Sequence, residues 1–289
     1  MIAGLRKSHA RIVPAGAVSG ALACLLAVST AAMAGTGQPT PWQIDFQTAV
    51  TPVMDAIYSF HAFLTILSAV ITLFVLVLLG ICILRFNERA NPVPSKTTHH
   101  TALEIVWTII PAIILIAIFV PSLRILFEQL EIPKSDLTVK ATGTAQWTWT
   151  YNYPDNGGFS FDSNMLQDNE RKPGQPRLLA VDNEMVVPVN KIVRMQVTAE
   201  GIIHSFAMPS FGIKIDAIPG RLNETWFKAT REGMFYGQCS ELCGRNHAFM
   251  PIAIRVVSER EFATWVEDAK KKFAAVPDSA TVVVAEAAR

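Results

Sequence analysis

The stretch AFLTILSAVITLFVLVLLGICIL, residues 62–84, decides the architecture of this chain. It carries no charged side chain, and a helix of this length can cross a hydrocarbon core of about 30 Å. A second uncharged run, residues 105–123, contains Pro111 and Pro121, which membrane helices tolerate where neighbouring helices satisfy the freed carbonyl groups. The two runs together predict a transmembrane helical hairpin.

The segment between the two runs predicts the orientation of the hairpin. It carries Arg85, Arg89 and Lys96 against a single acid, Glu88. Cationic loops of membrane proteins stay in the cytoplasm, so we expect both ends of the hairpin on the outer side. Residues 1–34 agree, because a cationic start, an Ala-rich apolar run and an Ala-Met-Ala ending are typical of a cleavable signal peptide. An uncleaved N-terminal anchor is the alternative.

The charge balance of the chain argues against a nucleic-acid partner. Of its 289 residues 51% are hydrophobic, and 25 Lys and Arg face 24 Asp and Glu. Some of those cations lie in the signal peptide, so the remainder of the chain is slightly acidic. The cationic run at residues 270–272 is typical of the solvated end of a helix rather than of a basic binding stripe.

After the hairpin the hydrophobic pattern changes to short alternating segments. Residues 137–142, 147–153, 192–198 and 252–257 alternate in this way and are separated by Gly, Pro, Asp and Asn. Repeated short strands without helices between them predict an all-β sandwich or barrel. Ser258 begins a capping-box sequence followed by apolar residues at helical spacing, so we expect one amphipathic helix to close the domain.

These patterns divide the chain into consecutive segments. We expect the signal peptide at 1–34, an N-terminal extracytoplasmic segment at 35–60, the hairpin at 61–127, the outer domain at 128–275 and a flexible tail at 276–289. The tail is rich in Ala and Val and shows no periodic pattern, as is common at chain ends.

The residues that carry chemistry lie in YGQCSELCGRNHAFMP, residues 236–251. Cys239 and Cys243 supply two thiolates, His247 supplies an imidazole and Met250 supplies a thioether. This combination of soft and intermediate ligands favours copper over hard cations. The segment therefore predicts a copper site in the outer domain.

The residues alone leave several kinds of site open. A disulfide between the two cysteines would need neither the histidine nor Met250, and a tetrahedral zinc site would leave Met250 unexplained. A mononuclear blue-copper site would leave one cysteine over. Two copper ions bridged by both sulfurs would require a second histidine. His204 is the histidine that remains in the outer domain beside His247, so the inventory matches a dicopper centre.

Longer motifs resemble those of a known family, subunit II of cytochrome c oxidase, in its bacterial aa3-type form with a dicopper (CuA) centre. The resemblance covers almost the whole chain after the signal peptide. The matching segments are LEIVWTIIPAIILI (103–116), QWTWTYNYP (146–154), KPG-x-x-RLL-x-VDN (172–183), HSF-x-MPSFG-x-K-x-DAIPGR-x-N (204–223) and GQCSELCG-x-NH-x-FMP (237–251).

The resemblance implies a cupredoxin-like Greek-key barrel or sandwich that holds two copper ions. Cys239 and Cys243 would bridge the ions, and His204 and His247 would each supply one imidazole. The weaker ligands would be Met250 and the backbone carbonyl of Glu241. The side chain of Glu241 would reach a magnesium ion shared with subunit I.

The resemblance also implies that electrons come in through Trp147, which this family places between docked cytochrome c and the copper pair. A different interpretation follows from periodicity, because Trp147, Trp149, Tyr151 and Tyr153 alternate and would share one buried strand face. The chain carries Thr148 where the family often has an aromatic residue.

Acidic residues are the expected docking groups for cytochrome c, whose haem edge is ringed by lysines. The positions that align with acids of the family are Asp162, Asp182 and Glu200, and Asp155 is an unaligned candidate. Each of them is also an ordinary surface carboxylate. Glu104 matches a glutamate near the mouth of a proton channel of subunit I, although an acid in the first turn of a helix needs no such role.

The implied function is that of the electron-accepting subunit of a terminal respiratory oxidase. It would take electrons from cytochrome c and pass them to the haem groups of subunit I, where oxygen is reduced to water and protons are pumped. The expected location is the bacterial inner membrane, with both termini and the copper domain on the periplasmic side. Subunit III is expected as a further partner. The alternatives are a quinol oxidase subunit II, a free-standing copper carrier and a metal-free, disulfide-stapled module.

Overall fold

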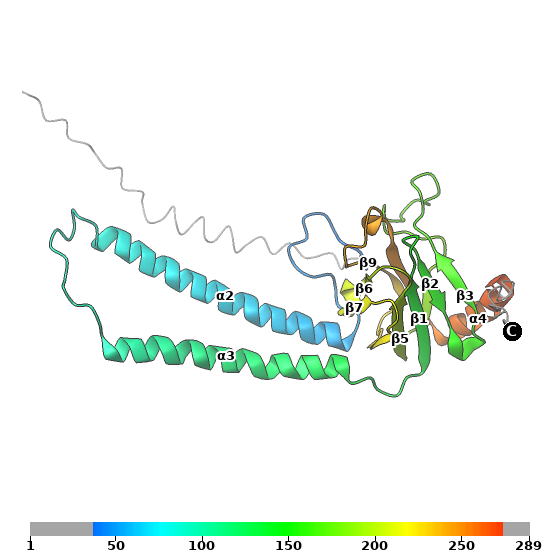
Figure 1. Ribbon diagram of the computed structural model, residues 1–289, viewed down its shortest axis with the longest axis horizontal. Helices are drawn as coiled ribbons and strands as arrows, with labels where there is room; N and C mark the ends of the chain where they lie inside the picture. The colour runs from blue at the N-terminus through cyan, green and yellow to red at the C-terminus, as the bar shows by residue number, and fades with distance from the viewer. Residues whose placement is uncertain (1–36, 274–289) are drawn as a thin grey trace, which may run out of the picture. The chain divides into compact units, whose positions relative to one another are not determined.

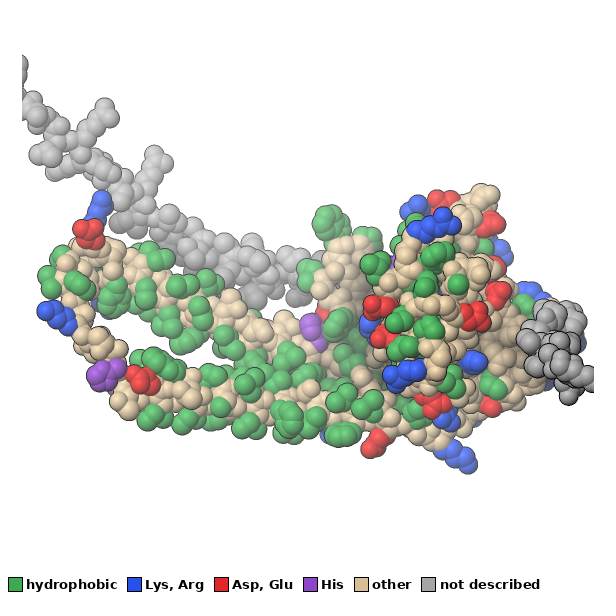
Figure 2. Space-filling model, viewed as in Figure 1, with side chains coloured by type: hydrophobic (Ala, Val, Ile, Leu, Met, Phe, Trp, Pro, Cys, Tyr) green, Lys and Arg blue, Asp and Glu red, His purple; other side chains and the backbone are tan. Residues whose placement is uncertain are grey.

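The computed structural model describes residues 37–273, so the expected signal peptide and the whole of the expected tail lie outside the described residues. Two long helices, α2 (Pro52–Arg85) and α3 (Thr101–Leu130), form the hairpin that the sequence predicts (Figure 1). Both are long and apolar enough to cross a membrane, and neither is buried by the rest of the chain. Hydrophobic side chains cover them along their length (Figure 2), as contact with lipid requires.

Side-chain caps define where both helices begin. Thr51 accepts a hydrogen bond from the backbone N–H of Met54 at 3.1 Å, and its hydroxyl donates to the carbonyl of Phe211 at 2.7 Å. The start of α2 is therefore tied to the outer domain. At α3 the carboxylate of Glu104 accepts a hydrogen bond from the backbone N–H of His100 at 3.2 Å. Glu104 thus stabilises a helix start, which is the simpler of its two interpretations.

The outer domain is a sandwich of two five-stranded sheets with the orders β3-β2-β1-β5-β8 and β4-β10-β9-β6-β7. Strands β1 and β5 are parallel, as are β4 and β10, and the other neighbours are antiparallel. The strands are β1 (Leu137–Gly143), β2 (Trp149–Asn152), β3 (Ser160–Ser163), β4 (Met185–Pro188), β5 (Ile192–Ala199), β6 (His204–Met208), β7 (Ile213–Ala217), β8 (Asn223–Lys228), β9 (Gly233–Cys239) and β10 (Pro251–Val257). The expected cupredoxin-like architecture is confirmed.

Alternating side chains fill the space between the sheets. Strand β1 buries every second residue, including Val139 and Ala141, and β5 does the same with Val193, Met195 and Val197. Strand β10 is buried on both faces, which explains its nearly continuous apolar sequence. The predicted alternation of more buried and more exposed side chains is therefore found in β1 and β5 but not in β10.

The closing helix, α4 (Glu259–Phe273), covers an aromatic cluster at one side of the sandwich. The Trp265 ring lies 5.1 Å from the Tyr153 ring and 5.8 Å from the Phe159 ring, centroid to centroid. Ser258 caps the helix as predicted, because its hydroxyl accepts from the backbone N–H of Glu261 at 3.2 Å. The reciprocal half of the capping box is absent among the described contacts, since the Glu261 carboxylate accepts from Arg255 instead.

Strand ends that are distant in sequence meet at one end of the sandwich. Gly143 at the end of β1 pairs with Ala199 at the end of β5. Strand β6 pairs with β9 so that Phe206 lies opposite Cys239. This arrangement brings His204, the first residue of β6, beside Cys239, the last residue of β9. The end of the sandwich where these strands meet positions the candidate site.

Candidate metal centre

The candidate ligands come from three parts of the fold. His204 begins β6 and Cys239 ends β9, so the pairing of these strands fixes both. Cys243 lies in the loop that leaves β9. His247 begins the short helix η3 (His247–Phe249), and Met250 directly precedes β10. One loop anchored in two core strands therefore carries most of the donors.

The donors around Cys239 lie within contact distance of its sulfur. Sγ of Cys239 is 3.8 Å from Nδ1 of His204 and 3.4 Å from the backbone carbonyl oxygen of Glu241. The sulfur of Cys243 is 3.8 Å from that of Cys239. His204, Cys239 and Cys243 are all buried, and their donor atoms lie within 4.8 Å of one another.

The donors around Cys243 form a similar group. Sγ of Cys243 is 3.5 Å from Nδ1 of His247 and 3.7 Å from Sδ of Met250. Each sulfur therefore has one imidazole nitrogen and one weaker donor beside it. Such a set divides naturally between two metal ions that share both sulfurs.

The sulfur separation excludes a disulfide in this structure. A disulfide bond is about 2.0 Å long, whereas both cysteines are free and their sulfurs are 3.8 Å apart. Two donors that each lie about 2.0 to 2.3 Å from one tetrahedral metal ion are about 3.3 to 3.8 Å apart. The observed separations of 3.5 to 3.8 Å match ligands of a common metal.

Burial sets the protonation of the donors. It raises the pKa of the Cys243 thiol to about 12, with the neighbouring Cys239 sulfur as the second cause. It also lowers the pKa of His204, so this imidazole is neutral at pH 7, which is the form that binds metals. Because the pKa of the Cys243 thiol lies far above 7, this thiol loses its proton at neutral pH only when a metal cation binds the sulfur in place of the proton. The donor set therefore fits a soft transition metal.

Trp147 departs from the buried face predicted by periodicity. Trp149, Tyr151 and Tyr153 are fully buried, whereas Trp147 precedes β2, has a φ of 61° and is half-buried. Its indole N–H donates to the backbone carbonyl of Cys243 at 2.9 Å. The residue that replaces the family's aromatic, Thr148, forms a 2.8 Å hydroxyl pair with Thr144 that closes this turn.

The predicted docking acids are only partly brought together. Asp182 accepts hydrogen bonds from Asn164, and the carbonyl of Asp162 accepts from the side chain of Asn183, the residue after Asp182. These two carboxylates therefore share one surface. Glu200 lies apart from them, hydrogen-bonded through its N–H to the carbonyl of Gly143 beside the metal centre.

Asp155 and Glu241 lie in different surroundings. The carboxylate of Asp155 accepts from the backbone N–H of Thr138, near the start of β1 and therefore at the other end of that strand from Gly143. Asp155 is thus not brought to the metal centre. The side chain of Glu241 is exposed, while its carbonyl faces Cys239. This separation of main chain and side chain is what a residue with two partners requires.

Sequence reasoning missed Gly143. An added Cβ at this residue would lie 2.7 Å from Cδ2 and 3.0 Å from Cγ of His204. No motif marks Gly143, because the contact joins two strands far apart in the chain. Gly244 has a similar role beside Trp147, with a φ of 116° and only 3.0 Å between an added Cβ and the indole.

A membrane-anchored β-sandwich with a buried Cys, His and Met centre defines a membrane-bound copper protein of the cupredoxin type. The family model "Cytochrome C oxidase subunit II, periplasmic domain" matches residues 137–257, and the model "Cytochrome C oxidase subunit II, transmembrane domain" matches residues 39–125. The chain belongs to the cytochrome c oxidase subunit II family.

Individual relatives agree with the family assignment. The chain is 52% identical to a probable cytochrome c oxidase subunit 2 of Rickettsia felis, over 87% of this chain and 79% of the relative. It is 46% identical to cytochrome c oxidase subunit 2 of Cereibacter sphaeroides, over 88% of this chain and 91% of the relative. A solved structure is also similar to part of this chain. The crystallised periplasmic domain of cytochrome oxidase subunit II from Bradyrhizobium japonicum is 71% identical with a TM-score of 0.47, and the match covers 50% of this chain and 99% of that structure.

We predict that Gly143→Ala reduces copper binding without unfolding the domain. Its backbone conformation is open to alanine, so the methyl group acts by displacing the imidazole of His204, whose Nδ1 lies 3.8 Å from the Cys239 sulfur. Copper per chain and the copper absorption spectrum would measure the effect. Gly80→Ala in α2 is the matched control, because an added Cβ there meets nothing within 4 Å. Normal copper content and spectrum in Gly143→Ala would contradict the steric argument.

Proposed function

We propose that this chain is the electron-accepting subunit of a terminal respiratory oxidase in the bacterial inner membrane. It takes electrons from cytochrome c at a dinuclear copper centre and passes them to the haem groups of subunit I, which reduces oxygen to water and pumps protons. The observation that carries the proposal is the pair of buried sulfurs, each with one imidazole and one weaker donor beside it.

The donors named above would hold the copper ions. Cys239 and Cys243 would bridge, His204 and His247 would supply imidazoles, and Met250 and the carbonyl of Glu241 would be the weak ligands. When bound, the copper pair supplies one-electron redox chemistry in which a single charge is spread over two ions. The chain keeps the donors in place because β6, β9 and β10 are parts of a packed core, so little rearrangement accompanies a change of charge.

Trp147 is our candidate for the residue through which electrons come in. Its indole is partly exposed, and its N–H bonds to the carbonyl of Cys243, which belongs to a candidate ligand. Electronic coupling falls with distance, so the 2.9 Å hydrogen bond couples Trp147 to Cys243 more strongly than a wider gap would. The side chain therefore links the surface of the domain to the metal centre by one short contact.

Partners outside the membrane and within it follow from this role. Asp162, Asp182 and Glu200 would attract the lysines of cytochrome c, which steers association more than it strengthens binding. Subunit I would pack against the hairpin, and subunit III would be a further partner in the complex. Glu104, at the cytoplasmic start of α3, would stand near the mouth of a proton channel in addition to capping its helix.

The topology completes the proposal. The cationic loop between the helices would face the cytoplasm, and both termini and the copper domain would face the periplasm. Residues 1–34 would be removed after export. A quinol oxidase subunit II of the same fold would lack the copper donors, whereas this chain supplies all of them.

A magnesium ion would bind the side chain of Glu241 at the boundary with subunit I. The carboxylate is exposed and so is free to reach a second protein surface. Magnesium prefers hard oxygen donors and keeps several waters, so the partner subunit would complete its shell.

We predict that Trp147→Phe keeps its copper but transfers electrons from cytochrome c at least about tenfold more slowly, equivalent to about 1.4 kcal/mol of activation free energy. Phenylalanine preserves an aromatic ring but loses the N–H bond to Cys243. Flash-induced reduction of the assembled oxidase would measure the rate. Trp226→Phe is the control, because it also loses an indole bond, to the carbonyl of Glu128. Equal rates in both variants would remove Trp147 from the electron path.

We predict that Glu241→Gln leaves the copper spectrum intact and weakens the second metal site. Glutamine retains the backbone carbonyl but removes the negative charge that magnesium prefers. Manganese would be substituted for magnesium in the assembled oxidase, and its paramagnetic resonance would be titrated in the wild type, in Glu241→Gln and in the control Glu200→Gln. Indistinguishable manganese binding in all three would assign Glu241 a main-chain role only.

A further inference from the structure

A polar cleft of about 660 Å³ opens beside Trp147. Its wall includes the amides of Gln146, Asn164 and Asn246 together with Asp168 and Arg177. The proposed docking carboxylates Asp162, Asp182 and Glu200 are not part of this wall. Apart from Asp168 and Arg177, the polar residues that line the surface next to the proposed input residue are uncharged.

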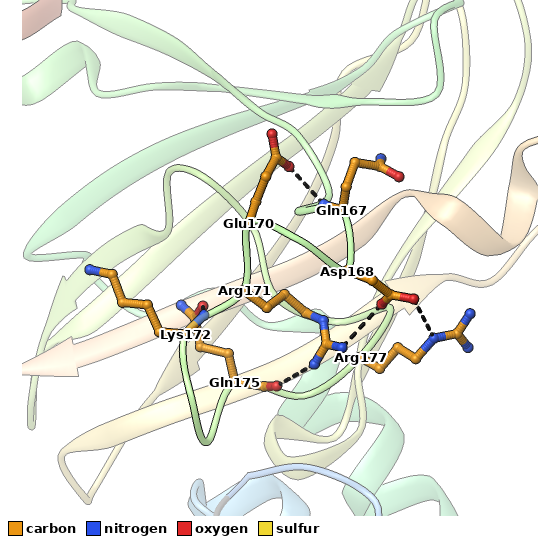
Figure 3. A network of polar contacts seen from close by, with 7 residues as sticks. All are labelled: Gln167, Asp168, Glu170, Arg171, Lys172, Gln175 and Arg177. Carbon is orange, nitrogen blue, oxygen red and sulfur yellow. Dashed lines mark hydrogen bonds and ion pairs between the residues drawn. The ribbon is translucent and has the colours of Figure 1, made fainter.

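The single carboxylate in the cleft wall is already paired. Asp168 accepts from Nη2 of Arg171 at 3.1 Å and from Nε of Arg177 at 3.2 Å (Figure 3). Arg171 also donates to the carbonyl of Gln175, which holds the loop in place. Two guanidinium groups on one carboxylate leave a net positive charge. Asp168 is therefore a poor partner for a lysine of an incoming protein.

A further cation lies on the input residue itself. The guanidinium carbon of Arg245 is 5.8 Å from the centroid of the Trp147 ring, within the range of a cation–π contact. Arg245 is exposed and has no ion-pair partner among residues 37–273. Its loop is fixed on both sides by the candidate ligands Cys243 and His247. The charge of Arg245 is thus not neutralised by an ion pair among residues 37–273, and the backbone that carries it belongs to the ligand loop.

We propose that Arg245 determines donor specificity at the docking surface. Its guanidinium selects a donor protein that presents a hydrogen-bond acceptor, a carbonyl or carboxylate oxygen, opposite Trp147, and disfavours a donor that presents a lysine there. The inference rests on the proposed function, because it takes Trp147 as the residue that faces the donor.

Two zones of opposite character follow from this arrangement. Carboxylates outside the cleft attract a basic donor over a distance of about one Debye length. Beside Trp147, Arg245 repels an ammonium group that approaches the indole, and a like-charge contact at an interface opposes binding. The donor that fits best is therefore basic where it faces the carboxylates and carries an acceptor where it faces Trp147.

The test compares Arg245→Gln with wild type in the assembled oxidase, using a soluble cytochrome c whose haem edge is ringed by lysines. We expect the variant to react roughly 3- to 10-fold faster at low ionic strength, through a lower KM with kcat unchanged, and the gain to disappear at high salt. Acetylation of the donor's lysines removes the charge that Arg245 repels. The ratio of the variant's rate to the wild-type rate should therefore be smaller with the acetylated donor than with the native donor. Arg245→Lys, which retains the charge, should behave as wild type does.

Arg260→Gln supplies the matched control. It removes the same charge from α4. The first turn of this helix lines a cleft with Leu137 at the start of β1, whereas Trp147 follows the end of that strand, so Arg260 lies at the opposite end of β1 from Trp147. Equal KM values and salt dependence in Arg245→Gln and Arg260→Gln would overturn the proposal. A changed copper spectrum in Arg245→Gln would also overturn it, by showing a structural role in the ligand loop.

Failure of the proposed function would look different. If Trp147 is not the input residue, Trp147→Phe retains its rate whatever Arg245→Gln does to KM. Failure of the specificity proposal leaves the loss of rate in Trp147→Phe intact and abolishes only the charge effect of Arg245. The double variant, measured beside both single variants, separates these outcomes.

Discussion

The antiparallel pairing of β6 with β9 is the constraint on which the metal centre depends. It places Phe206 opposite Cys239 and so brings the imidazole of His204 to within 3.8 Å of the Cys239 sulfur. A slip of one residue would turn every side chain of β6 to the other face of the sheet and remove the histidine. The buried neighbours of these strands hold the register, so the packing of the core also determines which donors meet at the metal centre.

The same burial couples the protein to its metal. Two thiols in contact inside a protein resist ionisation, as the raised pKa of Cys243 shows. A copper pair would relieve that cost, and the free energy of metal binding would then contribute to the stability of the loop. Trp147 adds to the loop's order by binding the Cys243 carbonyl from outside. The proposed electron input and the order of the loop would therefore depend on the same contact.

The sequence predicted the features that depend on local pattern and composition. The uncharged runs gave the hairpin, the alternation at residues 137–142 and 192–198 gave strands, and the donor inventory gave the centre. The close steric contacts between distant segments and the course of the turns escaped prediction. Nothing in the sequence marks the contact of Gly143 with His204, and periodicity placed Trp147 on a face that holds only Trp149, Tyr151 and Tyr153. The turn closed by Thr144 and Thr148 changes the direction of the chain just before β2.

Electron paramagnetic resonance of the copper-loaded, partly oxidised chain tests the central claim most directly. The account predicts one unpaired electron coupled equally to two copper nuclei, because both sulfurs lie between two similar groups of donors. Cys243→Ser should abolish that signal, since a hydroxyl is a poor bridging ligand for copper. A hyperfine pattern from a single copper nucleus in the unmodified chain, or metal analysis showing zinc in its place, would contradict the account.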